Sequence, residues 1–284
     1  MNHLRTVILI PLLSVLQGQN DWLVIGTERA QSVSGIAVLN NQTFIVHDNK
    51  RKNEIRLGEI KIGNDRLEYI PIAWPNEELP FDLEALTIIP NSITDIIAME
   101  STGKCHWLVL NVAKQRLAYN GFIQLPDIKR PVNLEGFDLV QVGKQYLGVW
   151  GHRGKSSQPG KLYWGWVDFN TRVVTPVNSV DVTVDWPTKH VRHISDLKID
   201  NIGQCWVSAT SDPGDDGPFS SAVYNIGQFD YIDNQVTFKR FDNIRPSFKF
   251  EERKVEGFAL INDGILVATD DENFGGYVRT VYFK

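Results

Sequence analysis

Residues 133–138 read NLEGFD, and after a short turn residues 146–152 read YLGVWGH. The first segment opens with polar residues and becomes apolar, and the second is apolar and ends in a polar residue. Four other pairs of segments share this design. They are SGIAVL (34–39) with TFIVHD (43–48), DLEALT (82–87) with DIIAME (95–100), ISDLK (194–198) with CWVSATSD (205–212), and VEGFAL (255–260) with ILVATD (265–270). A pair of strands that recurs five times predicts a repeat architecture.

The spacing of the copies identifies the repeat. Aligned on Ser34, Glu84, Glu135, Asp196 and Glu256, the copies lie 50, 51, 61 and 60 residues apart. Four short strands with their turns need roughly 40–50 residues, which is the period of a propeller blade. No window shows a long apolar period of 3.6 residues, so we expect little helix. The sequence therefore predicts an all-β, five-bladed β-propeller, since an interval of 60 residues is too short to hold two blades and make a sixth.

The two ends of the repeat predict how the ring closes. After residue 254 the chain has room for only three strands, at residues 255–260, 265–270 and 277–283. Residues 21–26, ahead of the first copy, can supply the fourth. Such an overlap removes the open edges of the ring. We therefore expect residues 21–284 to form one domain whose last blade is completed by an N-terminal strand.

Composition narrows the class of protein. The 284 residues are 42% hydrophobic and 22% charged, as in an ordinary globular protein. The net charge is −5 and the pI about 5.7, so no basic field favours nucleic acid as a partner. Only two cysteines occur, Cys105 and Cys205; we place them on different blades and expect buried thiols. The sequence leaves the oligomeric state open, with a monomer expected.

The first twenty residues differ from the rest of the chain. Residues 1–6 carry one Arg and one His and no acid, and an apolar run follows at residues 7–16. This order is typical of a secretory signal peptide, and the run is too short to span a bilayer. We therefore expect residues 1–20 to be a signal peptide and the protein to be periplasmic or secreted; the alternative is a buried N-terminal strand or helix. No later segment is long and apolar enough to cross a membrane.

Acidic residues recur at the start of the innermost strand of four blades. Because the chain reverses after that strand, the end of the second strand should lie at the same mouth of the channel. Glu84, Glu135, Asp196 and Glu256 would then crowd together, and like charges at close range need a cation, a basic partner or raised pKa values. Carboxylate oxygens favour Ca²⁺ or Mg²⁺. The alternative is that each acid accepts hydrogen bonds from backbone amides of its own or the next blade.

The cores DLEAL (82–86), NLEGF (133–137) and VEGFA (255–259) resemble the D-L-E-G-hydrophobic signature of a loose group of propellers. This group includes phytase-like proteins with esterase-like activity, SdiA-regulated-type proteins and uncharacterised bacterial families, the last being nearest. The five-blade count also resembles calcium-activated nucleotidases. The resemblance implies a propeller and a calcium ion in the channel. The chain departs from the signature at Ser34, Ala85 and Leu197.

Three functions remain open from the sequence. The first is an exported hydrolase of phosphate esters or anhydrides, with calcium or magnesium on the four channel acids and with His152, Arg153 and Lys254 steadying the charge of a small anionic substrate. The second is a non-catalytic binding platform with a structural channel ion. The third is a five-bladed glycosidase that uses Glu84, Glu135 and Glu256, with Trp150 and Trp186 as aromatic platforms.

Overall fold

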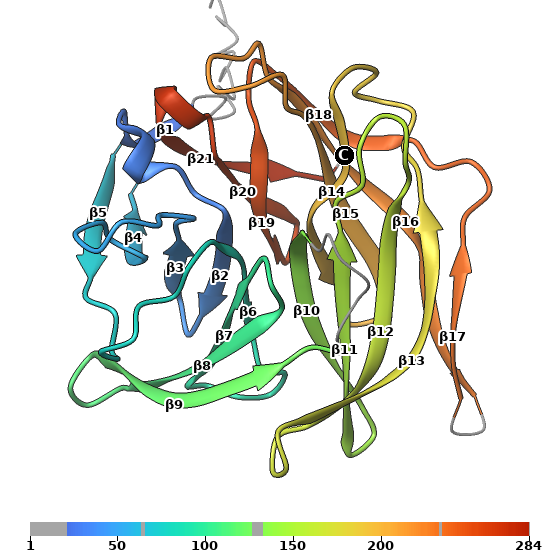
Figure 1. Cartoon of the computed structure of the whole chain (residues 1–284), viewed down its shortest axis with the longest axis horizontal. Coiled ribbons are helices and arrows are strands. Elements are labelled where there is room, and N and C mark those ends of the chain that lie inside the picture. Colours follow the sequence, from blue (N-terminus) through green and yellow to red (C-terminus); the bar gives the residue numbers. More distant parts are fainter. Residues whose placement is uncertain (1–21, 64–65, 127–132, 233–234, 284) are drawn as a thin grey trace, which may run out of the picture.

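The computed structural model describes residues 22–63, 66–126, 133–232 and 235–283. Five antiparallel sheets follow one another along the chain and surround a common centre (Figure 1). The predicted five-bladed propeller is confirmed. The predicted signal peptide lies outside the described residues. No helix within the described ranges is long and apolar enough to span a bilayer.

Each blade has four strands in chain order from the centre outward, except that the last blade takes its outer strand from the N-terminus. Blade 1 contains β2 (Gly35–Leu39), β3 (Gln42–Val46), β4 (Leu57–Ile62) and β5 (Leu67–Ile72). Blade 2 contains β6 (Leu83–Ile88), β7 (Asp95–Glu100), β8 (Lys104–Asn111) and β9 (Arg116–Gln124). Blade 3 contains β10 (Leu134–Val142), β11 (Gln145–His152), β12 (Gly160–Asp168) and β13 (Val173–Val182). Blade 4 contains β14 (Val191–Ile199), β15 (Gln204–Ser211), β16 (Ser220–Ile232) and β17 (Gln235–Arg240). Blade 5 contains β19 (Val255–Ile261), β20 (Gly264–Thr269), β21 (Gly276–Tyr282) and β1 (Leu23–Gly26).

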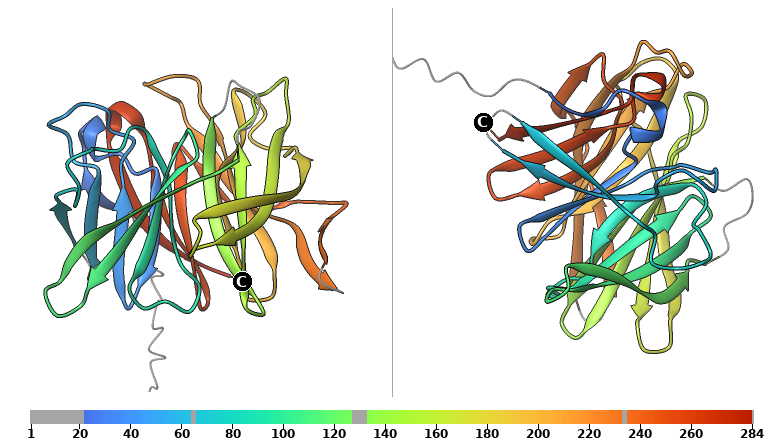
Figure 2. Two further views of the ribbon diagram at one scale, coloured as in Figure 1. Left: turned by 60° about the horizontal axis from the view of Figure 1, so that its bottom comes forward. Right: turned by 90° about the vertical axis from the view of Figure 1, so that its left-hand side faces the viewer.

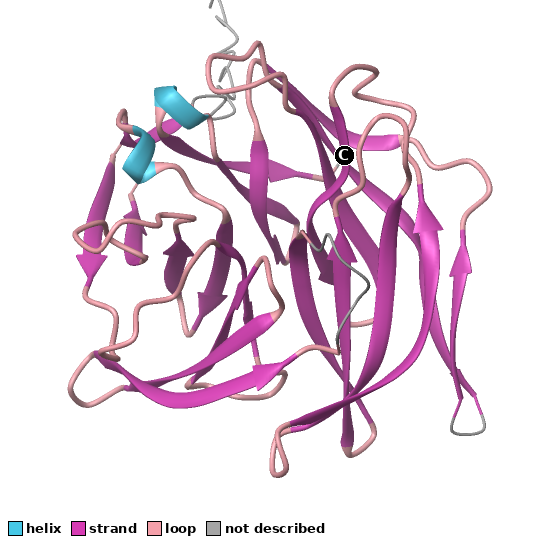
Figure 3. Ribbon diagram, in the orientation of Figure 1, coloured by secondary structure: helices cyan, strands magenta, loops and turns pink. Residues whose placement is uncertain are grey.

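Blade 4 carries an additional strand. One edge of the long strand β16 pairs with β17 over residues 227–232 and with β18 (Pro246–Glu251) over residues 220–224. Two short outer strands thus share one long neighbour, and the additional strand lies within the 60 residues that separate Asp196 from Glu256. In the described ranges the helical elements are the two single turns η1 (Arg29–Gln31) and η2 (Glu272–Phe274), drawn in cyan in Figure 3.

The N-terminal strand closes the ring as predicted. In β1, Leu23 pairs with Val278 and Val24 with Tyr277 of β21. Residues from the two ends of the chain therefore lie in one sheet (Figure 2). Ile25 of β1 is buried with Ile36 and Val278, so the closing strand also contributes apolar contact between blades 5 and 1.

The hydrophobic core lies between the blades. Each of five apolar clusters joins two neighbouring blades, because strand side chains point alternately to the two faces of a sheet and both faces are covered. Trp164 contacts Phe229 of the next blade edge-on, so its ring packs between blades 3 and 4. Cys105 on β8 and Cys205 on β15 are buried free thiols on different blades.

Candidate active site

Glu84, Glu135 and Glu256 occupy one structural position in three blades. In each innermost strand the pairing with the second strand shifts at the glutamate: Leu83 pairs with Glu100 and Ala85 with Met99, which leaves Glu84 between them. The pairing around Glu135 and Glu256 shifts in the same way. An extra residue of this kind bends the strand and redirects its side chain. The three carboxyls are therefore turned out of the ladder at one mouth of the channel.

Backbones of neighbouring blades approach closely beside these glutamates. A Cβ on Gly136 would lie 2.7 Å from the amide nitrogen of Leu197, and one on Gly35 would lie 2.7 Å from that of Leu86. Real Cβ atoms do not come so near a backbone, so a glycine is required at these points. The Gly that follows the acid in the sequence pattern thus lets the innermost strands, and with them the glutamates, come together.

The three glutamates act on one another electrostatically. Burial raises the pKa of Glu84 well above its usual range, and the charges of Glu135, Asp82 and Glu256 raise it further. Burial likewise raises the pKa of Glu256, against the opposing effect of Lys254 and Arg192. The predicted crowding of carboxyls from different blades is thereby present for these three residues.

Asp48 belongs to the same mouth. It follows β3 in blade 1, and burial together with the charge of Asp270 raises its pKa to about 7. The residue that follows the second strand of blade 1 therefore lies at the same mouth as the starts of the innermost strands. This is expected, because the chain reverses between the first and second strands of a blade. Lys50 binds the neighbouring Asp82 at 2.7 Å.

Arg192 lies in the middle of this acidic cluster. Its Nη1 is 2.8 Å from Oε1 of Glu256 and 3.7 Å from Oε2 of Glu135, and its Nη2 binds Asp212. Arg153 adds a second guanidinium, with Nη1 3.3 Å from Oε1 of Glu135. No role for Arg192 was predicted from the sequence. A basic residue at the start of a channel strand, in a blade that lacks the glutamate, was the available signal.

Lys254 is a buried cation with three acidic neighbours. Its Nζ lies 2.5 Å from Glu272, 3.3 Å from Asp270 and 3.4 Å from Glu256. Only 1% of the residue is exposed. Lys254 therefore joins the innermost strand of blade 5 to the segment that follows β20, and it neutralises part of the acidic cluster. Of the other predicted residues at this mouth, His152 is half-buried and its Nδ1 accepts a hydrogen bond from the amide of Gly154.

The alignment of Asp196 with the three glutamates is wrong. In β14, residues 193–195 lie opposite the single residue Ala209, so this strand contains extra residues. Gly136 packs against the backbone of Asp196 in the same way that Gly35 packs against Ala85. Asp196 thus has the position of the glycine, and Ser195 has that of the glutamate.

The Asp196 carboxylate has a structural environment. It accepts hydrogen bonds from Nζ of Lys198 at 2.9 and 3.0 Å and from the amide of Phe258 in the next blade at 2.9 Å. Asp196 therefore fits the alternative expectation for the repeated acids, in which the carboxylate accepts a hydrogen bond from a backbone amide of the next blade. Burial still raises its pKa to about 7.

The channel residues fit a divalent cation poorly. Arg192 and Arg153 already lie against Glu135, and Lys254 lies against Glu256, so a metal ion there would meet positive charge. Within the described ranges, no group of three or more His, Cys, Asp or Glu side chains is arranged to hold a metal. Repulsion between the carboxylates is instead reduced by basic side chains, which neutralise part of the cluster.

No protein-family model matches the chain, and no curated protein matches it. Solved structures do. An exo-1,5-α-L-arabinanase from a bovine ruminal metagenomic library aligns with TM-score 0.52 at 9% identity, over 91% of this chain and 97% of the other. A GH43 endo-arabinanase from Bacillus licheniformis aligns with TM-score 0.53 at 11% identity, over 93% and 98%.

The likeness is one of fold. Both alignments cover nearly the whole of each chain, which agrees with a single propeller, but the identities are too low to carry an activity across. The resemblance to phytase-like propellers remains one of short motifs.

Proposed function

We propose that the cluster of Glu84, Glu135 and Glu256 is the catalytic centre of a glycoside hydrolase. The observation that carries the proposal is the contrast between two of these carboxyls on neighbouring blades. Burial and like charge raise the pKa of Glu84, which favours its protonated form. Glu135 is accompanied by the guanidiniums of Arg153 and Arg192, which stabilise a carboxylate. Glycosidases need this pairing of an acid with a carboxylate.

The roles follow from the environments. Glu84 would donate its proton to the glycosidic oxygen as the bond to the leaving group breaks. Glu135 would either activate water or attack the anomeric carbon, and Arg192 would hold its charge and orientation. Glu256 would orient the substrate. Two arabinanases share the propeller fold, which adds a modest argument for glycosides. Hydrolysis of a phosphate ester through calcium has less support, because the residues fit the ion poorly.

A basic pocket beside the cluster supports an acidic substrate. It has a volume of about 330 Å³ and is lined by residues 153–157, 190–192 and Asp212. Arg153, Lys155 and His190 bring positive charge or hydrogen-bond donors to its wall, which suits a carboxylate. We therefore propose a glycoside of an acidic sugar as the substrate, in keeping with the small anionic substrate expected from the sequence.

The aromatic platforms proposed from the sequence do not serve this site. Trp150 packs in the apolar cluster between blades 2 and 3 and stacks on Tyr163, so its ring faces are covered by other side chains. Trp186 lies under the ammonium of Lys249, 5.0 Å from the ring centre. Contacts to the substrate would come from the charged residues at the mouth.

The experiment is a panel of uronide and neutral aryl glycosides, assayed with the wild type, Glu84→Gln, Glu135→Gln and the control Glu68→Gln. Glu68 lies on the exposed outer strand of blade 1. We expect hydrolysis of a uronide, a loss of about 10²–10⁴-fold in kcat for Glu84→Gln and Glu135→Gln, and no change for Glu68→Gln. Lys155→Gln should raise KM for the acidic substrate only. Wild type inactive on the whole panel, or full activity in Glu84→Gln, would leave the mouth as a binding platform and overturn the proposal.

A further inference from the structure

A second cavity lies between blades 2 and 3, away from the glutamate cluster. Its volume is about 780 Å³. Asp95 and Tyr146 line it near the first residues of β7 and β11, whereas the glutamate cluster meets the last residues of the same strands, Glu100 and His152. The cavity therefore opens at the other end of the blades. Nothing in the proposed chemistry uses it.

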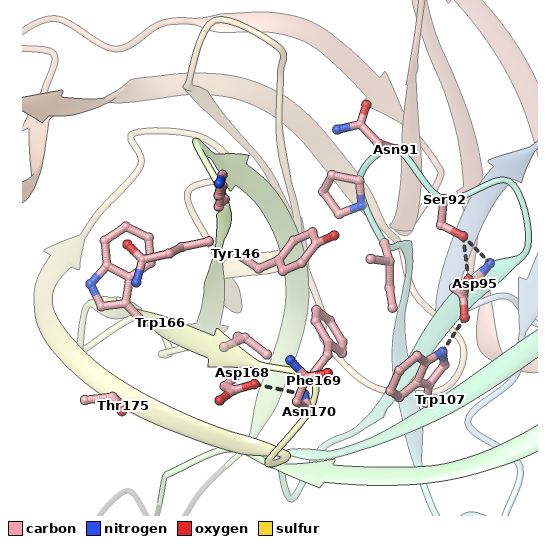
Figure 4. Close-up of a pocket in the computed structure, with 15 residues that line it drawn as sticks. Asn91, Ser92, Asp95, Trp107, Tyr146, Trp166, Asp168, Phe169, Asn170 and Thr175 are labelled. Atoms are coloured by element: carbon pink, nitrogen blue, oxygen red, sulfur yellow. Dashed lines mark hydrogen bonds between the residues drawn. The ribbon is translucent and has the colours of Figure 1, made fainter. Parts of the chain in front are cut away.

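Four aromatic side chains form much of the wall: Trp107, Tyr146, Trp166 and Phe169. All four are partly exposed. Figure 4 shows the rings of Trp166 and Trp107 on opposite sides of the group, with Tyr146 and Phe169 between them. Trp166 also packs against the apolar cluster between blades 3 and 4, and the other three rings pack against the cluster between blades 2 and 3, while part of each residue stays exposed.

The rings are held in fixed orientations. Phe169 contacts Trp107 and Tyr146 edge-on, with ring centres 5.2 and 5.0 Å apart. Nε1 of Trp107 donates a hydrogen bond to Oδ1 of Asp95 at 2.6 Å, and Ser92 and Thr94 donate to the other oxygen of that carboxylate. Trp166 packs edge-on against Tyr231, with ring centres 6.0 Å apart. A ligand would therefore meet preformed ring faces, and little side-chain entropy is lost on binding.

Polar side chains surround the rings. Gln145, Asn170 and Thr175 line the cavity, are exposed, and make no side-chain hydrogen bond to another described residue. The charged residues of the lining are one cation, Lys144, and two carboxylates, Asp95 and Asp168. The cavity therefore offers ring faces and neutral hydrogen-bonding groups and lacks the cluster of cations that an anion would need.

We propose that this cavity is a binding site for a neutral saccharide. The C–H faces of a sugar ring carry partial positive charge and pack on the negative face of an aromatic ring, while its hydroxyls need donors and acceptors at the edge. The cavity provides both, and its volume lies in the range of small-molecule sites. This site would hold a sugar without cleaving it, and the inference does not depend on the glutamate cluster being catalytic.

The test is titration of the protein with cellohexaose, xylohexaose and arabinohexaose, followed by calorimetry and by tryptophan fluorescence. It uses the wild type and Glu84→Gln, so that binding is measured whether or not the glutamates cleave a glycoside. We expect at least one hexasaccharide to bind both proteins equally. Trp166→Ala and Tyr146→Ala should each weaken that binding at least tenfold, and the control Tyr282→Ala, an exposed ring on blade 5, should not.

Thr175→Arg tests the same cavity in case Trp166→Ala or Tyr146→Ala does not fold. Thr175 is exposed at the rim of the cavity, so the larger side chain obstructs the site without removing a packed ring. We expect an unchanged melting temperature and at least tenfold weaker binding. No binding of any of the three saccharides by the wild type, or binding that survives both Trp166→Ala and Thr175→Arg, would overturn the proposal.

Discussion

Nη1 of Arg192 lies 2.8 Å from Oε1 of Glu256, although 64 residues separate them and they belong to different blades. The side chains are 17% and 3% exposed, so water screens this ion pair little. The same guanidinium reaches Glu135 and Asp212. One arginine thus connects blades 3, 4 and 5 at the mouth of the channel.

Removal of Arg192 should strongly destabilise the fold. Arg192→Met removes the cation that Glu135, Glu256 and Asp212 share and leaves the two glutamates only Arg153 and Lys254. Breaking a buried ion pair by removing one partner costs about 3 kcal/mol or more. The free energy of unfolding, measured in urea at pH 7, should fall by about that amount. Lys61→Met is the control, because Lys61 and Glu68 form an exposed pair at 4.0 Å. Equal, small effects of the two substitutions would show that Arg192 does not hold the cluster together.

Glu84 should make stability depend on pH. Its folded-state pKa is raised, so its contribution to stability is fully present below the unfolded-state pKa and is lost as the pH rises through the folded-state value. Glu84→Gln keeps the neutral form at every pH. The variant should therefore equal the wild type near pH 4 and become more stable than it at pH 8. Urea unfolding at the two pH values measures this, and a variant that is less stable at pH 8 would contradict the raised pKa.

The fold could be predicted because its signal is repeated. Each blade supplies a strand pair with the same apolar pattern, and the backbone approach beside Gly35, Gly136 and Gly257 requires a small residue in the same place. The closure of the ring also followed from a simple count of strands. Three of the four channel acids were placed correctly for the same reason.

The fourth acid and the central arginine could not be placed in the same way. In β14 the extra residues opposite Ala209 shift Asp196 out of the glutamate position, and a shift of register leaves no mark in an apolar pattern. Arg192 reaches Glu135 and Glu256 through a long side chain, and such contacts between distant residues depend on three-dimensional geometry. The sequence pattern therefore could not show whether a metal ion or a guanidinium neutralises the channel carboxylates, because that depends on the register of the strands.

Gly136 should tolerate no side chain. A Cβ there would lie 2.7 Å from a backbone nitrogen of the next blade, which cannot move without displacing β14. Gly136→Ala should lower the free energy of unfolding by about 2 kcal/mol or more, by overpacking. At Gly257 the nearest atoms would be at 3.2 Å, so Gly257→Ala should cost less. Thermal unfolding of the two variants gives the order, and the reverse order would contradict the approach of blades 3 and 4.

The closing strand offers a matched pair of substitutions. Ile25 is 6% exposed and packs between blades 5 and 1, whereas Val24, its neighbour in β1, is 49% exposed. Ile25→Asp buries an unpaired charge and should detach β1, which uncovers the edge of β21 for pairing with other chains. We expect a loss of about 3 kcal/mol or more and association that increases with protein concentration in light scattering. Val24→Asp places the same charge in water and should change stability by less than about 0.5 kcal/mol. If both variants remain monomeric and equally stable, β1 does not close the ring.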